Sequence, residues 1–551
     1  MPSAPPSPVW DGTEAEATAL LGWLTDPDAP RLCLVTGAPG SGKTALLGWL
    51  AAHGQRSARS RRRTPRVFVP LAGQTAVGAA WTIADRLGVV ARSPGDLVHA
   101  LATSETRPTG RVVLLLTDLH AAAEPAALTR LIAELAGVGR IRLVVEARSG
   151  TPAPALLRSE RRVTVVDLDG ASESTDGASV EPAPPLPDLS DPLAVCAADP
   201  LLVTTAYVTG AALAGVPGTL DGPEPSGRSG EAVVDEHGGL RTAWMRSGQS
   251  LCREQSSSER ALVLLAALGD SADPRLRPAL AALAEATPWR LRWARHRGDL
   301  NPPWPGPVTV LGAAGGPLAS VVLVGDPTGT VRLLHEADAR PAGRLAHSVA
   351  GRVTALAPAP DGTVLLLDDR GRLHSVRGTE PRAPYLERLT AAVSATLARH
   401  PGTALSAIAG SVVVGDRLGS VHAFGLTGLY QSASHSGRVT AVAAVESETP
   451  FVCSGGVDGT VRLWTPGREP SPEPLAERPS PVVSLHATET PRGPLVAAAW
   501  ADGLVELHRP EGGPTLSFRP GPPVRAVAVT GSGSLLVGTD ESLVCLVPRG
   551  K

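Results

Sequence analysis

Short apolar runs alternate with longer amphipathic stretches through the first 170 residues. The apolar runs lie at residues 31–36, 67–71, 112–117, 141–147 and 163–168. Runs of this length, rich in Val, Ile and Leu, are typical of strands buried on both faces, and strands that alternate with helices pair in parallel. The pattern predicts an α/β domain over residues 1–170, built on a five-stranded parallel sheet.

The middle of the chain follows a different pattern. Residues 171–192 are small, acidic and rich in proline, which indicates a linker. Apolar residues then recur at helical spacing through residues 193–300, which predicts an α-helical domain or linker. Trp289 and Trp293 stand four residues apart in this segment, and we interpret them as the core side of an amphipathic helix.

Residues 301–551 repeat a unit of two short strands joined by a tight turn. The turn positions, 39 to 48 residues apart, are Gly329, Gly371, Gly419, Gly459, Gly503 and Ser542. This spacing is typical of the four-stranded blades of a β-propeller, which bury their faces against one another. We predict an all-β propeller of six blades, with a seventh left open. The last unit has no room for an outer strand, so we expect an upstream segment such as residues 298–308 to complete the ring.

The fourth of these units, residues 435–464, resembles a WD repeat. It begins with His435-Ser436 in place of Gly-His and ends with Leu463-Trp464 in place of Trp-Asp. The resemblance implies that the propeller binds a protein partner through its top face and rim. We find no constellation of residues in it that predicts catalysis.

The motif with the most specific chemistry follows the first predicted strand. Residues 37–44 read GAPGSGKT and match the Walker A pattern G-x-x-x-x-G-K-[ST] in full. Glycines let the backbone curl so that successive N–H groups face a phosphate, and the helix that follows presents its positive end to the same anion. The sequence therefore predicts a P-loop that binds ATP or another nucleoside triphosphate.

Every residue of this loop is a candidate nucleotide contact. These residues are Gly37, Ala38, Pro39, Gly40, Ser41, Gly42, Lys43 and Thr44. Lys43 is one of only two lysines among 51 basic residues, and its compact charge can reach between phosphates where a planar guanidinium is too wide. Thr44 is the candidate ligand for Mg²⁺ through its hydroxyl.

The ends of two later strands supply further candidates. The third strand ends in LLLTDLH, where Asp118 is the candidate Walker B-type acid that holds Mg²⁺ or orients water. The fourth ends in VVEARSG, where Arg148 is either a sensor of the γ-phosphate or a solvated loop arginine. We interpret His120 as a surface or capping histidine.

The order of these motifs, preceded by the helical stretch TEAEATALLGWL at residues 13–24, resembles the signal-transduction ATPases with numerous domains (STAND). The resemblance implies an AAA+/NACHT-related nucleotide switch with two adjacent acids where this chain has Thr117-Asp118. The acidic motif is thus one carboxylate short, which makes any ATPase activity weak. The segment at residues 198–210 resembles the family's Gly-x-Pro signature, which makes Pro200 a weak candidate for contact with the nucleotide base.

Composition narrows the classes of partner. The net charge is −2 and no apolar run reaches the roughly 18 residues that span a bilayer, so neither nucleic acid nor a membrane is expected. The arginine-rich stretch at residues 55–66 lacks interleaved aromatic residues, and we interpret it as a solvated loop. The scattered cysteines and the absence of a signal-peptide pattern favour a cytoplasmic protein.

Three functions agree with these features to different degrees. The first is an ATP- and Mg²⁺-dependent signalling protein in which the P-loop domain is coupled to a propeller that binds a protein. The second is a scaffold that binds nucleotide with little or no hydrolysis, and Thr117 favours it. The third, a metabolic kinase, lacks a recognisable acceptor site. A nucleotide-dependent homo-oligomer is left open.

Overall fold

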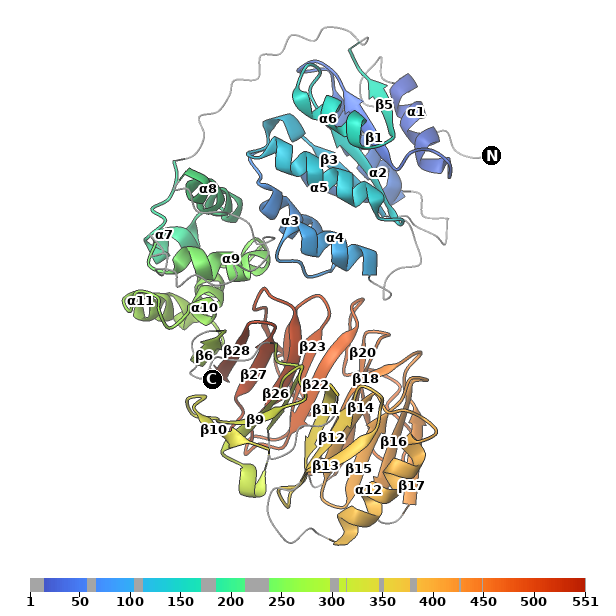
Figure 1. Cartoon of the computed structure of the whole chain (residues 1–551), viewed down its shortest axis with the longest axis vertical. Helices are drawn as coiled ribbons and strands as arrows, with labels where there is room; N and C mark the ends of the chain where they lie inside the picture. Colours follow the sequence, from blue (N-terminus) through green and yellow to red (C-terminus); the bar gives the residue numbers. More distant parts are fainter. Residues whose placement is uncertain are drawn as a thin grey trace. The chain divides into compact units, whose positions relative to one another are not determined.

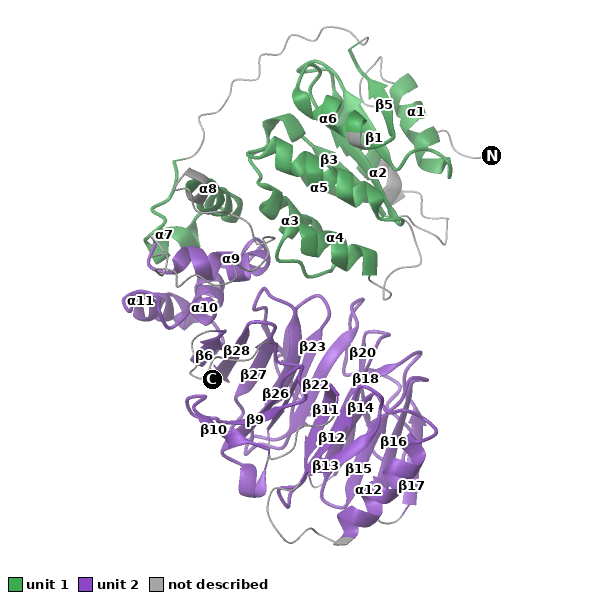
Figure 2. Ribbon diagram, viewed as in Figure 1, with its two compact units in different colours: residues 1–233 green, residues 234–551 purple. Residues whose placement is uncertain are grey.

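The computed structural model describes residues 14–56, 66–103, 112–169, 185–213, 237–297, 307–313, 315–345, 351–376, 384–425, 428–447 and 449–550. The chain divides into two compact units, residues 1–233 and 234–551 (Figures 1 and 2). The boundary falls inside the segment that we assigned to a helical domain. Among the described residues, no helix combines the length and the apolar character needed to cross a bilayer.

The first unit is built on a five-stranded parallel sheet, as the sequence predicts (Figure 1). Its strands are β1 (Leu32–Thr36), β2 (Arg66–Pro70), β3 (Val112–Thr117), β4 (Ile141–Glu146) and β5 (Val163–Asp167). They are ordered β2-β3-β4-β1-β5, and β1, β3 and β4 are buried along their whole length. Burial on both faces explains why these strands are continuous apolar runs.

Helices cover both faces of this sheet and form a core on each. Side chains of one strand parity, such as Cys33, Leu115 and Val144, pack with α1 (Glu14–Thr25) and α2 (Lys43–Arg56). Side chains of the other parity pack with α3 (Ala76–Leu87), α4 (Pro94–Thr103), α5 (Pro125–Gly137) and α6 (Pro152–Glu160). Alternation along each strand therefore decides which helices a residue faces.

Two helical segments follow. The first unit ends its described part with α7 (Pro192–Ala197) and α8 (Pro200–Leu213). The second unit begins with α9 (Leu240–Leu251), α10 (Ser257–Ala267) and α11 (Leu276–Leu283). A capping box at the start of α10, in which Ser256 and Glu259 satisfy each other's backbone N–H groups, fixes where that helix begins. The predicted helical segment thus exists but is shared between the units.

The rest of the second unit is a propeller of six sheets, within the described residues, which confirms the predicted architecture (Figure 1). The innermost strands of neighbouring sheets are in contact all around the ring. The first three sheets consist of β7 (Val310–Ala313), β8 (Val321–Gly325), β9 (Val331–His335) and β10 (Pro341–Arg344); β11 (Val353–Pro358), β12 (Val364–Asp368) and β13 (Leu373–Val376); and β14 (Ala404–Ile408), β15 (Ser411–Gly415), β16 (Ser420–Gly425) and β17 (Gly428–Ala433).

The remaining three sheets carry the chain to its end. They consist of β18 (Val439–Val445), β19 (Phe451–Gly456), β20 (Thr460–Trp464) and β21 (Ala476–Glu477); β22 (Val482–Thr488), β23 (Leu495–Trp500), β24 (Val505–His508) and β25 (Leu516–Phe518); and β26 (Val524–Val529), β27 (Leu535–Thr539), β28 (Ser542–Pro548) and the early strand β6 (Trp289–His296). Below, these sheets are called blades 1 to 6 in chain order.

The strand that completes blade 6 is β6, which pairs antiparallel with β28. An upstream segment thus completes the ring as expected, but it is β6 and not the segment at residues 298–308, most of which lies outside the described residues. The expectation of a helix at Trp289 and Trp293 was wrong, because Trp289–His296 is a strand. A spacing of four residues marks one face of a helix and equally one face of a strand, so the two tryptophans could not discriminate between them.

A bulge in β6 gives the two tryptophans different neighbours. Leu291 and Trp293 pair with consecutive residues of β28, which leaves Arg292 as the extra residue and reverses the facing of the strand beyond it. The indole N–H of Trp289 donates to Ser517 O in blade 5 at 2.8 Å, and that of Trp293 donates to Glu336 O in blade 1 at 2.8 Å. Both rings are buried. One strand thus fastens blade 6 to both of its neighbours.

Blade 2 departs from the four-stranded pattern. Its sheet has three strands among the described residues, and the helix α12 (Pro384–Leu397) follows. Leu386, Leu389, Val393 and Leu397 of this helix share a core with the strands of blades 2 and 3. The sequence repeat did not predict α12, because only the strand–turn–strand part of each unit recurs along the chain.

The turns that revealed the repeat have a common physical basis. An aspartate before each of the first five turns accepts backbone N–H groups from the turn, and the glycine that follows has a φ between 75° and 96°. These aspartates are Asp326, Asp368, Asp416, Asp458 and Asp502. A side chain on the turn glycine is excluded at Gly459, where a Cβ would lie 2.0 Å from Arg478 O. This explains why the turn signature recurs.

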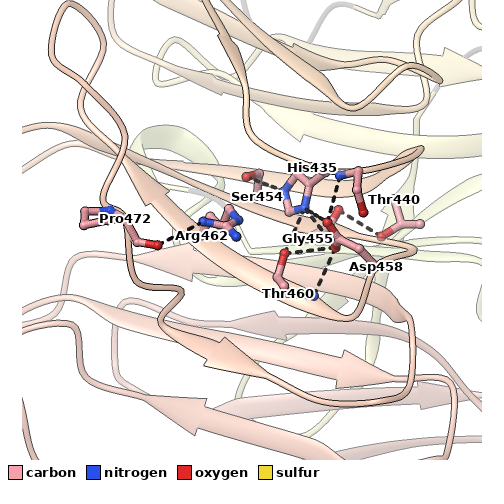
Figure 3. Close-up of polar contacts among 9 residues, drawn as sticks. His435, Thr440, Ser454, Gly455, Asp458, Thr460, Arg462 and Pro472 are labelled. Carbon is pink, nitrogen blue, oxygen red and sulfur yellow. Dashed lines mark hydrogen bonds and ion pairs between the residues drawn. The ribbon is translucent and has the colours of Figure 1, made fainter. Parts of the chain in front are cut away.

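Blade 4 adds a histidine to this turn (Figure 3). His435 Nδ1 lies 3.1 Å from Asp458 Oδ1 and 3.1 Å from Thr460 Oγ1, and His435 Nε2 lies 2.8 Å from Ser454 Oγ. The N–H of Ser436 donates to the other oxygen of Asp458 at 3.0 Å. The chain entering the blade is therefore bonded to the turn between its middle strands.

The two ionisable groups of this network are coupled to folding. Burial lowers the pKa of His435, so its neutral form is preferred, although Asp458 opposes the shift. Burial by itself would raise the pKa of Asp458, but the N–H groups of Ser436 and Thr460 together with His435 lower it. The folded blade thus prefers a neutral histidine beside an ionised aspartate.

Removing the tryptophans of β6 should open the propeller. We expect Trp289→Ala and Trp293→Ala each to lower the free energy of unfolding by about 3–5 kcal/mol, because each leaves a cavity and a buried carbonyl without its donor. Trp293→Phe keeps most of the volume and should cost far less. Denaturant unfolding followed by circular dichroism measures these values, with the exposed Arg290→Ala as control. Equal stability of Trp293→Ala and Arg290→Ala would contradict this role of β6.

The network of blade 4 should make the propeller sensitive to acid. Below about pH 6.5 the unfolded chain binds a proton at His435 that the folded blade resists, so stability falls as the pH drops, and protonation of Asp458 removes more below about pH 4. His435→Gln should cost about 1–3 kcal/mol at pH 7 and flatten the dependence between pH 7 and 5. Urea unfolding at both pH values tests this, and parallel losses in wild type and variant would contradict it.

Candidate functional site

The glycine-rich loop lies where the sequence places it, between β1 and α2. Gly40 and Gly42 have φ angles of 79° and 82°, which lie in the left-handed region that favours glycine. A Cβ on Gly37 would approach Ser41 Oγ to 2.4 Å, so the loop folds tightly back on itself. Nucleotide contact by residues 37–44 stays a prediction, and the curled backbone has the form that it requires.

Lys43 is held inside this loop and is only 5% exposed. Its ammonium group donates to Gly37 O at 3.0 Å, to Ala38 O at 2.6 Å and to Ser41 Oγ at 3.2 Å, which accounts for all three of its protons. Burial lowers the pKa of Lys43, while the carboxylates of Glu146, Asp169 and Asp118 act in the opposite direction. The centre of the loop therefore holds one buried positive charge, that of Lys43.

Thr44 contacts an acid that we had not predicted. Its hydroxyl oxygen lies 2.9 Å from both carboxylate oxygens of Glu146, the last residue of β4. Glu146 is 2% exposed, and burial together with the nearby charge of Asp118 raises its pKa, against the hydroxyl of Thr44 and the charge of Lys43. The sequence signal was an acid at the end of a buried strand whose three preceding residues are apolar, two residues before Arg148.

Asp118 lies close to this pair, in an uncommon conformation. It follows β3 with φ 56° and ψ 34°, a left-handed geometry that aspartate tolerates better than most residues. Its backbone N–H is bonded to the carboxylate of Glu146, and its own charge acts on Lys43 and Glu146. The structure therefore brings the predicted acid to the P-loop. The hydroxyl of Thr117, one residue earlier, is buried without a hydrogen-bond partner among the described residues.

Arg148 and His120 stand at the same edge of the sheet. Arg148 is exposed, and the next residue, Ser149, donates its N–H to Gly37 O at 3.2 Å. His120 is half-buried, and burial first and the charge of Arg148 second lower its pKa. The two side chains thus lie near Lys43 and Asp118, which is where a phosphate sensor would have to be.

A second unpredicted acid faces the loop from the end of β5. The carboxylate of Asp169 accepts the backbone N–H of Ala38, and its charge acts on Lys43. Thr36, the last residue of β1, is bonded in turn to Asp167 at 2.9 Å. The start of the loop is therefore tied to β5.

The structure does not bring Pro200 to this group of residues. Pro200 is the first residue of α8, whose start is capped by Asp199 through the N–H of Leu201 at 2.8 Å. Contacts of α8 include those with α3, with the loop after β2, where Thr205 donates to Gly73 O at 2.9 Å, and with Leu189 O, which accepts from the hydroxyl of Tyr207 at 2.8 Å. The weak resemblance at Pro200 gains no support from the geometry.

The propeller encloses a cavity of about 340 Å³, lined by the innermost strands of all six blades. Side chains in its wall bond across blades: Ser406 accepts the N–H of Ala444 at 2.9 Å, and Ser484 accepts that of Val527 at 3.1 Å. Among the described residues, no group of three or more His, Cys, Asp or Glu side chains could hold a metal ion. The serines in the wall of the cavity therefore link neighbouring blades to one another.

Comparison with known proteins finds similarity to proteins that form WD-repeat propellers. A profile of the family described as WD domain, G-beta repeat, matches residues 428–465, which contain most of blade 4. No curated protein matches the chain. The WD40 β-propeller domain of Doa1 is 14% identical, with a TM-score of 0.34, and the alignment covers 48% of this chain and 98% of that one. U3-55K is 15% identical, with a TM-score of 0.33 and coverage of 46% and 98%. The second unit therefore contains a β-propeller in which residues 428–465 match a WD repeat.

Proposed function

We propose that the first unit binds ATP or another nucleoside triphosphate together with Mg²⁺, and that the bound nucleotide regulates a propeller that binds a protein partner. The observation that carries the proposal is the environment of residues 37–44. A curled glycine-rich backbone holds one buried lysine, and the first turn of the helix that follows is bonded to a buried carboxylate. A loop that serves only as a connection needs neither group.

The residues at the site match the chemistry of a nucleotide. The N–H groups of the loop and of the first turn of α2 are donors for phosphate oxygens, and Lys43 supplies the compensating charge. The hydroxyl of Thr44 and the carboxylates of Glu146 and Asp118 are hard oxygen ligands of the kind that Mg²⁺ takes when phosphates supply the rest. When bound, Mg²⁺ would offset the charge of the phosphates.

Lys43 and Thr44 already have partners within the protein. A nucleotide must therefore replace the bonds of Lys43 to Gly37 and Ala38 and the bond of Thr44 to Glu146. The free and bound arrangements of the loop differ as a result. A nucleotide that binds one arrangement more tightly than the other shifts the protein toward that arrangement, which is what a nucleotide switch requires.

Turnover is the weaker part of this function. Thr117 stands where the STAND resemblance expects the first of two acids, and Asp118 is left as the second. We therefore propose slow hydrolysis, with Asp118 orienting water and Arg148 facing the γ-phosphate. The alternative is a scaffold that binds nucleotide without turnover and uses it to stabilise the first unit.

The propeller supplies the proposed surface for a protein. WD40 propellers generally mediate protein–protein interactions, and this one has exposed apolar side chains concentrated in blade 3. Among the described residues of the second unit, the large apolar side chains that are exposed are Leu418, Leu429 and Tyr430. Two of them lie on β17, the outer strand of that blade, where a partner can reach them.

Replacement of Lys43 tests nucleotide binding. We expect Lys43→Ala to weaken ATP binding roughly 10- to 100-fold, because a charge-assisted hydrogen bond of about 1.5–3 kcal/mol is lost. Lys43→Arg should also weaken it, because the planar group keeps the charge and does not fit the loop. Isothermal titration of the full chain with ATP and ADP measures both. Arg158→Ala, at an exposed position of α6, is the control, and equal affinities in all variants would refute the site.

The switch and the scaffold differ in what nucleotide does after it binds. Hydrolysis rate, together with sedimentation of the full chain in ATP and in ADP, separates them. We expect slow turnover and a change in sedimentation for the switch. Nucleotide binding without turnover and without a change in sedimentation favours the scaffold.

A further inference from the structure

Glu146, the acid that contacts Thr44, stands at the end of β4, whereas the sequence predicted the acid of this site at the end of β3. In the sheet, β4 lies between β1 and β3. Glu146 pairs with Val35 of β1, and the residue before it, Val145, pairs with Leu116 of β3. Thr117 is therefore the neighbour of Glu146 at the carboxyl edge. Position 117 lacks a carboxylate, and the adjacent position on β4 has one.

Both positions turn toward the helix that begins at the P-loop. Leu115 and Val144 belong to the core under α1 and α2, and two residues further along the same strands stand Thr117 and Glu146. Side chains two residues apart in a strand share a face. An acid at either position thus faces the first turn of α2. The one on β4 is closer by a strand, because β4 is bonded directly to β1.

Contacts from two directions fix the carboxylate of Glu146. The hydroxyl of Thr44 lies 2.9 Å from each of its oxygens, and the N–H of Asp118 is bonded to it from the end of β3. The hydroxyl of Thr117, a residue that is only 1% exposed, has no hydrogen-bond partner among the described residues. A buried polar group without a partner is uncommon and needs an explanation, such as a water or ion that completes the site.

We propose that Glu146, supplied by β4, replaces the acid that β3 lacks and is the carboxylate on which Mg²⁺-dependent nucleotide binding relies. In the free protein Glu146 holds Thr44. In the bound state it is the acid beside the Thr44 hydroxyl, and Asp118 positions it through a backbone N–H. This inference rests on the proposed nucleotide site and adds the residue that gives that site its metal dependence.

The test compares matched neutral variants of the two acids. Glu146→Gln and Asp118→Asn each remove one charge and keep the size, and the amide oxygen at 146 can still accept from Thr44 and Asp118. ATP affinity of the full chain is measured by calorimetry with excess Mg²⁺ and again with EDTA. We expect the ratio of the two affinities to fall roughly 10-fold or more in Glu146→Gln, and to fall by a smaller factor in Asp118→Asn, whose carboxylate is the second acid of the proposed site.

A second readout separates this role from a structural one. The amide oxygen of Glu146→Gln keeps an acceptor for the hydroxyl of Thr44, so this variant should keep a melting temperature near that of wild type at pH 7. Affinity for ATP in EDTA should also stay near that of wild type. A residue that served only to fix α2 would leave the Mg²⁺ ratio of Glu146→Gln intact, because the amide keeps that contact.

A rescue variant tests the placement itself. Because positions 117 and 146 are neighbours on one face, Thr117→Asp added to Glu146→Gln should restore part of the Mg²⁺ dependence. The same change should do nothing of the kind in the background of Thr44→Ala, which lacks the hydroxyl. Absence of recovery in a double variant that still binds ATP in EDTA would count against the two positions serving one site.

The outcomes distinguish this inference from the proposed function. Wild-type protein that binds no nucleotide refutes both. Wild-type binding that depends on Mg²⁺, with the dependence kept in Glu146→Gln and lost in Asp118→Asn, leaves the nucleotide site standing and assigns the acid to Asp118. Binding that ignores Mg²⁺ in every variant overturns the role of Glu146 and the Mg²⁺ part of the proposed function, and leaves nucleotide binding itself standing.

Discussion

Closure of the propeller depends on β6, whose buried indoles Trp289 and Trp293 fill space in the ring and donate hydrogen bonds to blades 5 and 1 from opposite sides of its bulge. Every blade buries its faces only while both neighbours are present, so the ring is stable as a whole or not at all. The strand that closes it comes from before blade 1, and the two halves of blade 6 are about 250 residues apart in the chain. Packing of the other blades depends on this long-range pairing.

Within the ring, polar groups are used for internal bonds. Aspartates order the turns, the His435 network ties blade 4 to its entering chain, and serines in the central wall join neighbouring blades. These bonds restrict local movement of the framework, because breaking one of them leaves a buried group without its partner. This favours a platform that presents a fixed surface to a partner.

The proposed nucleotide site of the first unit has the opposite character. Lys43 and Thr44 are bonded to groups that a nucleotide would have to displace, and Glu146 carries a charge that burial disfavours. The free loop therefore has its hydrogen bonds made but also carries a buried charge that is unfavourable. Such a loss of stability is typical of functional sites. Parallel strands gather these residues at one edge, although they come from three separate parts of the sequence.

The sequence by itself determined the features that depend on local rules: the apolar strands of the sheet, the glycine-rich loop before α2, and the turns that repeat through the propeller. It left open the features that depend on which strands become neighbours. Trp289 and Trp293 fit a helix as well as a strand, and only pairing with β28 decided between them. Glu146 was one acid among many until β4 took its place beside β1 and brought the carboxylate to Thr44. Contacts between distant segments leave no periodic signal, so tertiary structure alone could reveal them.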